Sequence, residues 1–430
     1  MQRLLYLDNC RGFSNCWIPL ADVNFLVGEN STGKTSVLLL SRFIVSPKTF
    51  LETPSAHAAK LGLFREIVSA HSDNKDYFCL GAVNGTEVKD AGLALGGMLL
   101  TFVDENGSPR LKAVTSANGD RQVTFFLESD AIFQDIVDLP VSDVETMKDR
   151  VDKWKATHLA ARTETATKIE SPAGLTGSGL PIILAFIWLA NSEGNTPEKM
   201  VFPPVIGEDD PIWISPIRSK PRRTYDQPET LFSSEGDHTP YLIRRMLKSS
   251  EDKKRLNEFL ERVGKRSGLF EEIRVKSFGD DALGPFEIDA VIGGLPLNLS
   301  WVGYGVSQCL PILVELIHQK AATWFAIQQP EVHLHPRAQA CLGDVFFEAA
   351  LDGKRLLVET HSDFTIDRFR MNYRRERKHK PTSQILFFER KGKQNTVVPI
   401  DISAEGEISD AQPTSYRRFF VREENKLLGI

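Results

Sequence analysis

Gly28-Glu29-Asn30-Ser31-Thr32-Gly33-Lys34-Thr35-Ser36 carries the strongest signal in the chain, because it matches the pattern G-x-x-x-x-G-K-[ST] in full. It follows an apolar run at 23–27 and opens a helix-like stretch. Glycines at its two ends let the backbone wrap around an anion, and N–H groups at a helix N-terminus supply positive potential. Lys34 is expected to reach the β- and γ-phosphates, and the Thr35 hydroxyl to coordinate Mg²⁺. The stretch therefore predicts a nucleoside-triphosphate site with ATP and Mg²⁺ as cofactors.

Composition sets the class of protein around this loop. The 430 residues include 26 Phe, 7 Tyr and 6 Trp, and 41% are hydrophobic, which is enough for a large core and two or three lobes. With 52 Lys and Arg against 57 Asp and Glu, the net charge of −5 excludes a globally basic nucleic-acid coat but leaves room for a local basic groove. No apolar run approaches the ~20 residues that a bilayer requires, and no secretory signal is expected. Five scattered Cys predict neither a disulfide framework nor a zinc pair, so a cytoplasmic protein without a membrane partner is expected.

The order of apolar runs predicts an α/β fold. Strands joined by Asn-Gly turns are expected between 77 and 133, as antiparallel hairpins. A mainly helical insertion is expected at 134–275, where Leu256, Phe259, Leu260 and Val263 share one helical face. Strands return after 270. We therefore predict an N-terminal lobe at 1–133, the helical insertion, and a C-terminal lobe at 276–430.

Three further motifs stand late in the chain. A glycine-rich turn, Trp301-Val-Gly303-Tyr-Gly305-Val-Ser307-Gln308, opens an amphipathic helix. A hydrophobic strand ends in Gln328-Gln329-Pro330-Glu331-Val-His333-Leu-His335-Pro336, and a last strand ends in Glu359-Thr360-His361-Ser362-Asp363. With the loop at 28–36, these motifs resemble the ABC-type ATPase heads of the SMC/RecF and OLD group. More narrowly they are similar to bacterial AAA15/DUF3696-like ATPases, many of which are subunits of phage-defence or overcoming-lysogenization-defect systems. The resemblance covers about 1–45 and 285–400.

The resemblance implies a P-loop NTPase fold, as a two-lobed ABC-type head with an antiparallel β subdomain. It implies that the glycine turn (Gly303, Gly305, Ser307, Gln308) acts as a signature motif, capping the γ-phosphate bound by a second subunit. In related heads the signature Ser precedes Gly, where this chain has Tyr304, so either Ser307 or backbone N–H groups would make that contact. His361 matches the switch His that hydrogen-bonds the γ-phosphate. His333 and His335 lack the i, i+4 spacing of a helical zinc site, and we interpret them as part of a turn that faces the partner subunit.

One departure bears on hydrolysis. A Walker B strand normally ends in Asp-Glu, which orient Mg²⁺ and polarise the attacking water, whereas this chain has Gln328 and Gln329. An amide oxygen can accept a hydrogen bond, but it carries no charge and takes no proton at pH 7. ATP binding should survive, and hydrolysis should be slow unless Glu331 or Glu359 substitutes.

Residues 368–380 contain seven Lys or Arg. They are interpreted either as a solvated helix face or as part of a nucleic-acid groove, which Arg218, Lys220, Arg222 and Arg223 would extend. After residue 385, neither an acidic cluster of a Toprim nuclease nor an H-N-H pattern is present.

The predicted function is an ATP-dependent dimerising or higher-order sensor or scaffold. It would belong to a bacterial antiviral system of the PARIS or Septu kind and control a separate effector, a nuclease. The alternative is a RecF/SMC-like DNA-maintenance ATPase that clamps DNA directly, and a third possibility is an ATPase chaperone or regulator unrelated to either.

Overall fold

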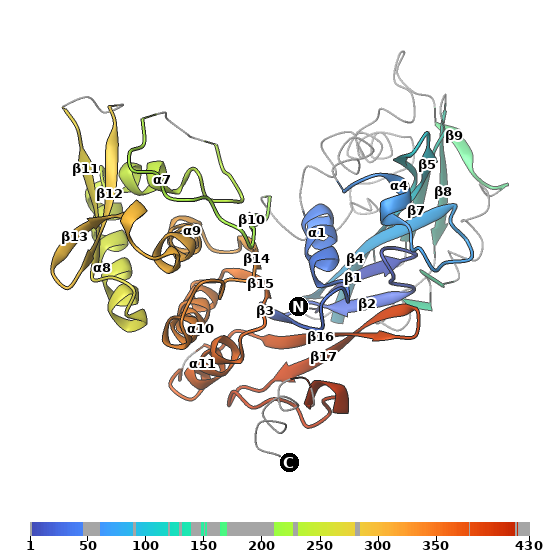
Figure 1. The fold of residues 1–430 in the computed structure, drawn as a ribbon. Helices are drawn as coiled ribbons and strands as arrows, with labels where there is room; N and C mark the ends of the chain where they lie inside the picture. The colour runs from blue at the N-terminus through green and yellow to red at the C-terminus, as the bar shows by residue number, and fades with distance from the viewer. Residues whose placement is uncertain are drawn as a thin grey trace. The chain divides into compact units, whose positions relative to one another are not determined.

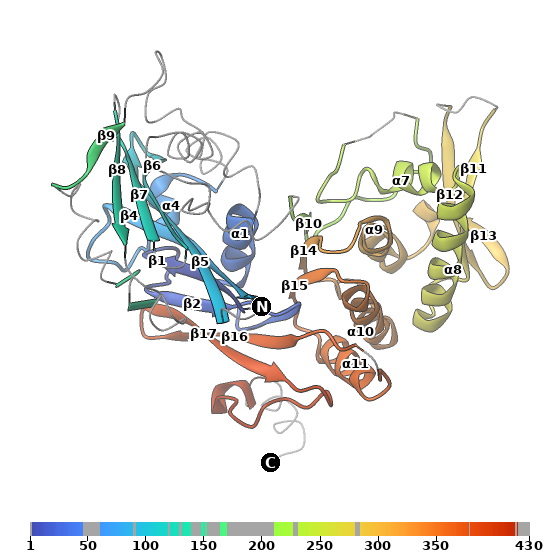
Figure 2. The ribbon, with the colours of Figure 1, turned by 180° about the vertical axis from the view of Figure 1, so that it is seen from behind.

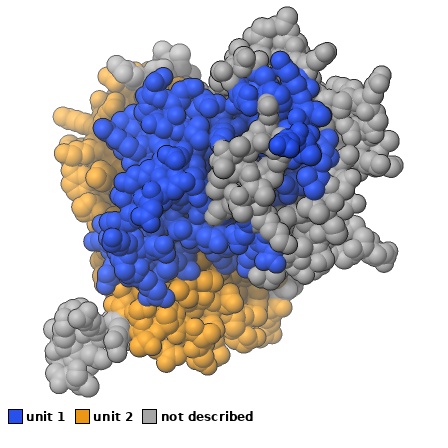
Figure 3. All heavy atoms as spheres, turned by 90° about the vertical axis from the view of Figure 1, so that its right-hand side faces the viewer, with its two compact units in different colours: residues 1–20, 29–210, 388–397 blue, residues 21–28, 211–387, 398–430 orange. Residues whose placement is uncertain are grey.

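The computed structural model forms two compact units, one of residues 1–20, 29–210 and 388–397, the other of residues 21–28, 211–387 and 398–430 (Figure 3). It describes residues 2–45, 61–88, 92–118, 121–128, 131–138, 148–149, 151–152, 164–169, 210–226, 231–279, 284–377, 379–417 and 419.

The first unit is built on an eight-stranded antiparallel sheet with the order β2-β1-β4-β5-β6-β7-β8-β9 (Figure 1). Its strands are β1 (Gln2–Asp8), β2 (Cys16–Pro19), β4 (Tyr77–Val88), β5 (Gly92–Glu105), β6 (Ser108–Asn118), β7 (Arg121–Leu127), β8 (Ile132–Asp138) and β9 (Thr167–Ile169). Among the described residues of this unit, the helices α1 (Lys34–Val45) and α4 (Phe64–Ile67) accompany the sheet. The antiparallel strands are confirmed, and Asn106 and Gly107, with φ of 55° and 85°, form the predicted tight turn between β5 and β6. Another Asn-Gly pair of this region, Asn84-Gly85, forms no turn and lies inside β4.

The second sheet has six strands in the order β10-β14-β15-β3-β16-β17. They are β3 (Val23–Gly28), β10 (Ile212–Ile214), β14 (Trp324–Gln328), β15 (Arg355–Glu359), β16 (Ser383–Lys391) and β17 (Gln394–Ile402). Strands β10, β14, β15 and β3 pair in parallel, and β3 and β14 are buried at every residue. Because parallel strands end at one edge, the residues that follow β10, β14, β15 and β3 are brought together.

Helices and a small sheet complete the second unit. The helices are α7 (Thr239–Met246), α8 (Ser250–Ser267), α9 (Tyr304–His318), α10 (Pro336–Leu351) and α11 (Asp363–Tyr373), with a 3-10 turn η3 (Leu299–Trp301) before α9. The sheet contains β11 (Glu272–Ser277), β12 (Phe286–Ile292) and β13 (Leu295–Asn298). Figures 1 and 2 show α8 beside this sheet and α10 beside α11. The predicted apolar face of α8 is buried at Leu256, Leu260 and Val263, and Ser249 caps its start.

The predicted α/β class, with a parallel sheet that leads into the glycine loop and a separate antiparallel β subdomain, is confirmed. The boundaries 1–133, 134–275 and 276–430 stay a prediction, because most of 139–209 lies outside the described residues. Much of the mainly helical insertion predicted at 134–275 falls in that range. Within the described ranges, no helix has the length and apolar character to cross a membrane.

Close packing of α10 on α11 yields a stability prediction. A Cβ added at Gly343 would stand 2.3 Å from the Thr365 carbonyl oxygen and 2.7 Å from the Phe369 nitrogen. Gly343→Ala should therefore push the helices apart and lower the free energy of unfolding by about 1–3 kcal/mol, measured by urea denaturation without nucleotide. Gly303→Ala is the control, because no described atom lies within 4 Å of its Cβ position. Equal stability of the two variants would contradict the prediction.

Candidate nucleotide-binding site

The glycine loop folds back on itself at the start of α1. Ser31 and Gly33 adopt left-handed φ values of 62° and 96°. The Lys34 ammonium, on a residue that is only 4% exposed, donates to the Glu29 carbonyl oxygen at 2.7 Å, and the Thr32 hydroxyl donates to the same oxygen at 2.7 Å. A turn closed in this way directs successive backbone N–H groups toward one side, which is the geometry of an anion cradle.

Three residues distant in sequence, Phe13, Arg390 and Asn395, contact this loop or each other beside it. A Cβ at Gly33 would stand 2.6 Å from the Phe13 ring and 3.1 Å from the Asn395 side-chain nitrogen, so packing as well as φ requires glycine there. Arg390 donates to the Ser31 carbonyl oxygen at 2.7 Å and to Asn395 at 3.3 Å. Sequence reasoning missed all three residues, because none belongs to a recognisable motif.

A buried carboxylate lies beside the Walker B position. Gln328 and Glu359 are register partners at the ends of β14 and β15, and the Gln328 amide donates to a Glu359 carboxylate oxygen at 3.1 Å. Glu359 is only 4% exposed. Since β15 lies between β14 and β3, this carboxylate is one strand nearer than Gln328 to the strand that leads into the loop, about 5 Å by the usual strand spacing. Of the two candidate substitutes, Glu359 is therefore the better placed.

Glu331, the other candidate substitute for the Walker B carboxylate, makes hydrogen bonds to the turn after β15. One carboxylate oxygen accepts from the Thr360 hydroxyl at 2.8 Å, and the other accepts from the His361 backbone N–H at 2.7 Å. Thr360 N–H in turn donates to the Leu26 carbonyl oxygen of β3 at 3.2 Å. Glu331 thus fixes the turn after β15, and each of its two carboxylate oxygens already accepts a hydrogen bond. His361, in the same turn, is exposed.

The start of α9 is exposed at Gly303 and Tyr304 and half-buried at Gly305. A Cβ at Gly305 would approach the His333 carbonyl oxygen at 3.0 Å, so packing favours glycine there. Gly303 is different: its φ of −60° suits any residue, and its Cβ position has no described atom within 4 Å. Folding of the described chain therefore does not require glycine at 303, whereas close approach of an outside group would.

Ser307 and Gln308, both predicted to bind nucleotide, point inward. The Ser307 hydroxyl donates to the Tyr304 carbonyl oxygen at 3.0 Å, and Ser307 is 6% exposed. The Gln308 amide uses both of its ends on the backbone of Arg218, at 3.1 Å and 3.2 Å. The sequence left two donors open for the contact with the γ-phosphate, the Ser307 hydroxyl and backbone N–H groups. Because Ser307 points inward, this geometry favours the backbone N–H groups at the start of α9.

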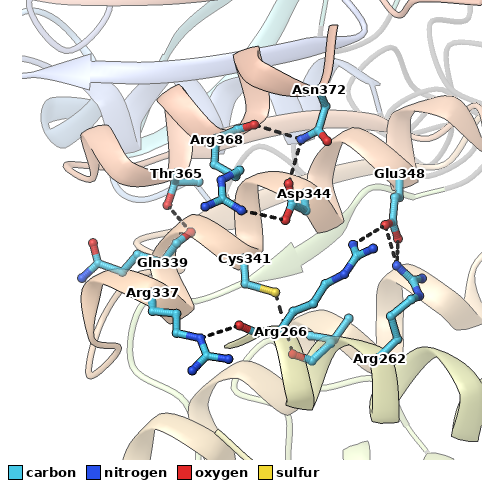
Figure 4. Close-up of polar contacts among 11 residues, drawn as sticks. Arg262, Arg266, Arg337, Gln339, Cys341, Asp344, Glu348, Thr365, Arg368 and Asn372 are labelled. Atoms are coloured by element: carbon cyan, nitrogen blue, oxygen red, sulfur yellow. Dashed lines mark hydrogen bonds and ion pairs between the residues drawn. The ribbon is translucent and has the colours of Figure 1, made fainter. Parts of the chain in front are cut away.

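The basic residues that the sequence offered for a nucleic-acid groove have mixed surroundings, and Lys220, Arg222 and Arg223 are exposed. Arg218 is buried rather than exposed. Figure 4 shows Arg368 directed at Asp344 and Arg262 and Arg266 directed at Glu348; the Arg368–Asp344 distance is 3.4 Å. Arg370 pairs with an aspartate, and Lys380 donates to a carbonyl oxygen. Exposed arginines remain just after α11, at 374, 375 and 377.

The histidines after β14 have separate surroundings. His335 caps α10, and its Nδ1 accepts from the Ala338 N–H at 3.4 Å. The His333 ring lies 5.6 Å from the Tyr304 ring, and its backbone φ is 63°. In the part of the chain that the structure describes, no group of three or more His, Cys, Asp or Glu is arranged to hold a metal ion.

The match to a known protein family lies within the second unit. Residues 215–367 match the family described as "AAA domain, putative AbiEii toxin, Type IV TA system". No curated protein matches the chain.

Solved structures similar to the chain include an SMC head bound to the C-terminal winged-helix domain of ScpA, at 12% identity and a TM-score of 0.46, covering 94% of this chain and 97% of that one. An SMC head with an extended coiled coil, bound to the C-terminal domain of ScpA from Pyrococcus furiosus, has 11% identity, a TM-score of 0.45 and 99% coverage of both chains. The SMC head of Thermotoga maritima has 12% identity and a TM-score of 0.37, covering 93% of this chain and 99% of that one. The family match supports an ATPase of AAA type, and it spans the glycine turn, the end of β14 and the switch segment.

Proposed function

We propose that the chain is an ATPase that binds ATP and Mg²⁺ on residues 28–36. The observation that carries this proposal is the closed loop at the start of α1, where left-handed Ser31 and Gly33 and the nearly buried Lys34 form an anion cradle. Bound Mg²⁺ would neutralise charge on the β- and γ-phosphates. Its expected protein donors are oxygens, as Mg²⁺ prefers: the Thr35 hydroxyl and the Gln328 amide.

The second part of the proposal is self-association around the nucleotide. The exposed start of α9, with a glycine at 303 that internal packing does not require, supports contact with the phosphate held by another copy. A helix N-terminus is itself an anion site, so the backbone N–H groups suffice without the inward-pointing Ser307. His361, exposed after β15, would hydrogen-bond the same γ-phosphate.

Slow hydrolysis would make ATP a long-lived link between copies. Both Walker B carboxylates are replaced by amides, so turnover should lie below about 1 s⁻¹, the low end of typical enzymes. Such a protein suits a sensor or scaffold of a bacterial antiviral system that controls a separate effector nuclease. The family match, whose description names a toxin of a toxin–antitoxin system, supports a role in systems of that kind.

Sedimentation velocity with and without a slowly hydrolysed ATP analogue and Mg²⁺ tests the proposal. Wild type should bind the nucleotide and shift to a dimer or larger species. Gly303→Leu should still bind nucleotide but remain monomeric, because its side chain would occupy the space needed by the second copy. Lys254→Leu, changed at an exposed position of α8, is the matched control and should associate like wild type. The proposal would be refuted if wild type did not bind the nucleotide, or if its association were the same with and without the nucleotide.

A further inference from the structure

Arg218 is a residue of the second unit to which neither the sequence motifs nor the family match gives a role. It follows β10, is only 3% exposed, and donates through Nη2 to the carbonyl oxygens of Gln328 at 2.9 Å and Gln329 at 3.3 Å. Gln329 has a left-handed φ of 41°, a conformation that an ordinary side chain disfavours. Arg218 therefore binds the end of β14, including Gln329, whose left-handed backbone is strained.

The backbone of Arg218 is held by α9. Its N–H donates to the Gln308 side-chain oxygen at 3.1 Å, and the Gln308 amide nitrogen donates to the Arg218 carbonyl oxygen at 3.2 Å. Gln308 is 3% exposed and lies one turn after the exposed start of α9. A continuous set of hydrogen bonds thus runs from α9 through Arg218 to the turn after β14. In that turn the Gln329 N–H also donates to the Glu359 carbonyl oxygen at the end of β15, at 2.8 Å.

A purely structural link would not need this side chain. Nε and Nη1 of Arg218 are buried and have no partner among the described residues. Burial lowers the pKa of the guanidinium to about 10, although the nearby Glu331 carboxylate opposes that shift. A buried cation with unpaired donors destabilises a fold, and an apolar side chain of similar size would be less costly. Its presence indicates a functional requirement for a charged, forked donor at this edge.

We propose that Arg218 is a positioning residue for ATP hydrolysis, which transmits contact at the start of α9 to the Gln328–Gln329 strand end. The inference rests on the proposed function and adds its regulation: engagement of α9 by a second copy sets the geometry of the hydrolytic edge in the same subunit. Because the link lies behind the exposed residues, it should govern turnover rather than nucleotide affinity or association.

Three measurements on Arg218→Gln, Arg218→Lys and wild type test this: nucleotide affinity, nucleotide-dependent association and single-turnover hydrolysis. Arg218→Gln should bind and associate within about twofold of wild type but hydrolyse at least tenfold more slowly. Arg218→Lys should recover part of that loss, since it keeps the charge but not the fork. Lys220→Gln, which removes a charge from an exposed position of the same loop, is the control and should hydrolyse like wild type.

Gln308→Ala provides an independent variant, and it carries the test alone if Arg218→Gln does not fold. It should slow hydrolysis with binding intact, and the double variant should be no slower than the slower single one, because both act in one series of contacts. Effects that multiply, unchanged hydrolysis in the single variants, or a wild type that binds and associates without hydrolysing would overturn the inference. A wild type that neither binds nor associates would instead refute the proposed function itself.

Discussion

Lys34→Ala is expected to weaken ATP binding by at least 100-fold, measured by isothermal titration calorimetry in Mg²⁺ buffer. The Lys34 ammonium lies within the loop at 2.7 Å from the Glu29 carbonyl oxygen, placed to exchange this neutral partner for phosphate oxygens. Hydrogen bonds to charged groups contribute about 1.5–3 kcal/mol each. Two such bonds exceed the ~2.8 kcal/mol that corresponds to 100-fold in affinity.

Lys220→Ala is the matched control for Lys34→Ala. It removes the same side chain from an exposed loop position of the second unit, outside the glycine loop, and should leave ATP affinity unchanged. If the ATP affinities of Lys34→Ala and Lys220→Ala were equal, and that of Lys34→Ala lay within threefold of wild type, the loop would not hold the phosphates. The proposed function would then fail at its first step.

The loop could be predicted from sequence because its chemistry is local. Nine consecutive residues contain the glycines, the lysine and the hydroxyl, and the apolar run before them identifies the strand. Its support could not be predicted. Phe13 and Asn395 meet at Gly33 through folding of segments nearly four hundred residues apart, and neither has a periodic or motif signal. The short strands β2 and β13 were likewise missed, since strands of four residues carry little pattern.

Charged residues show the same limit. Arg218 lies among four basic residues in six positions, a pattern typical of an exposed basic turn. It is buried because β10 pairs in parallel with β14, which places the following residues against the end of that strand. In the same way the sequence offered Glu331 and Glu359 as equal substitutes, and only the register of β14 with β15 separates them. Such distinctions depend on long-range pairing that spacing along the chain does not encode.

Glu359→Gln is expected to slow single-turnover hydrolysis about 100-fold while leaving ATP affinity within threefold of wild type. Removal of a carboxylate that polarises water or accepts its proton typically costs 10²–10⁴ in rate. Glu359 is the buried carboxylate at the end of β15, and its Gln328 partner cannot replace the lost charge. Affinity should persist because the loop supplies most phosphate contacts.

Glu331→Gln separates this catalytic role from a structural one. A glutamine at 331 can accept from only one of its two present donors, the Thr360 hydroxyl or the His361 N–H. The lost hydrogen bond should lower the free energy of unfolding by about 1 kcal/mol, and hydrolysis should fall less than in Glu359→Gln. If Glu331→Gln were the slower variant and Glu359→Gln hydrolysed like wild type, the water-activating carboxylate would have to be assigned to Glu331.

A wild-type rate above about 1 s⁻¹ would contradict slow turnover altogether. Retained activity in both variants would mean that water is activated without either side chain, leaving the Gln329 amide and backbone groups to orient it.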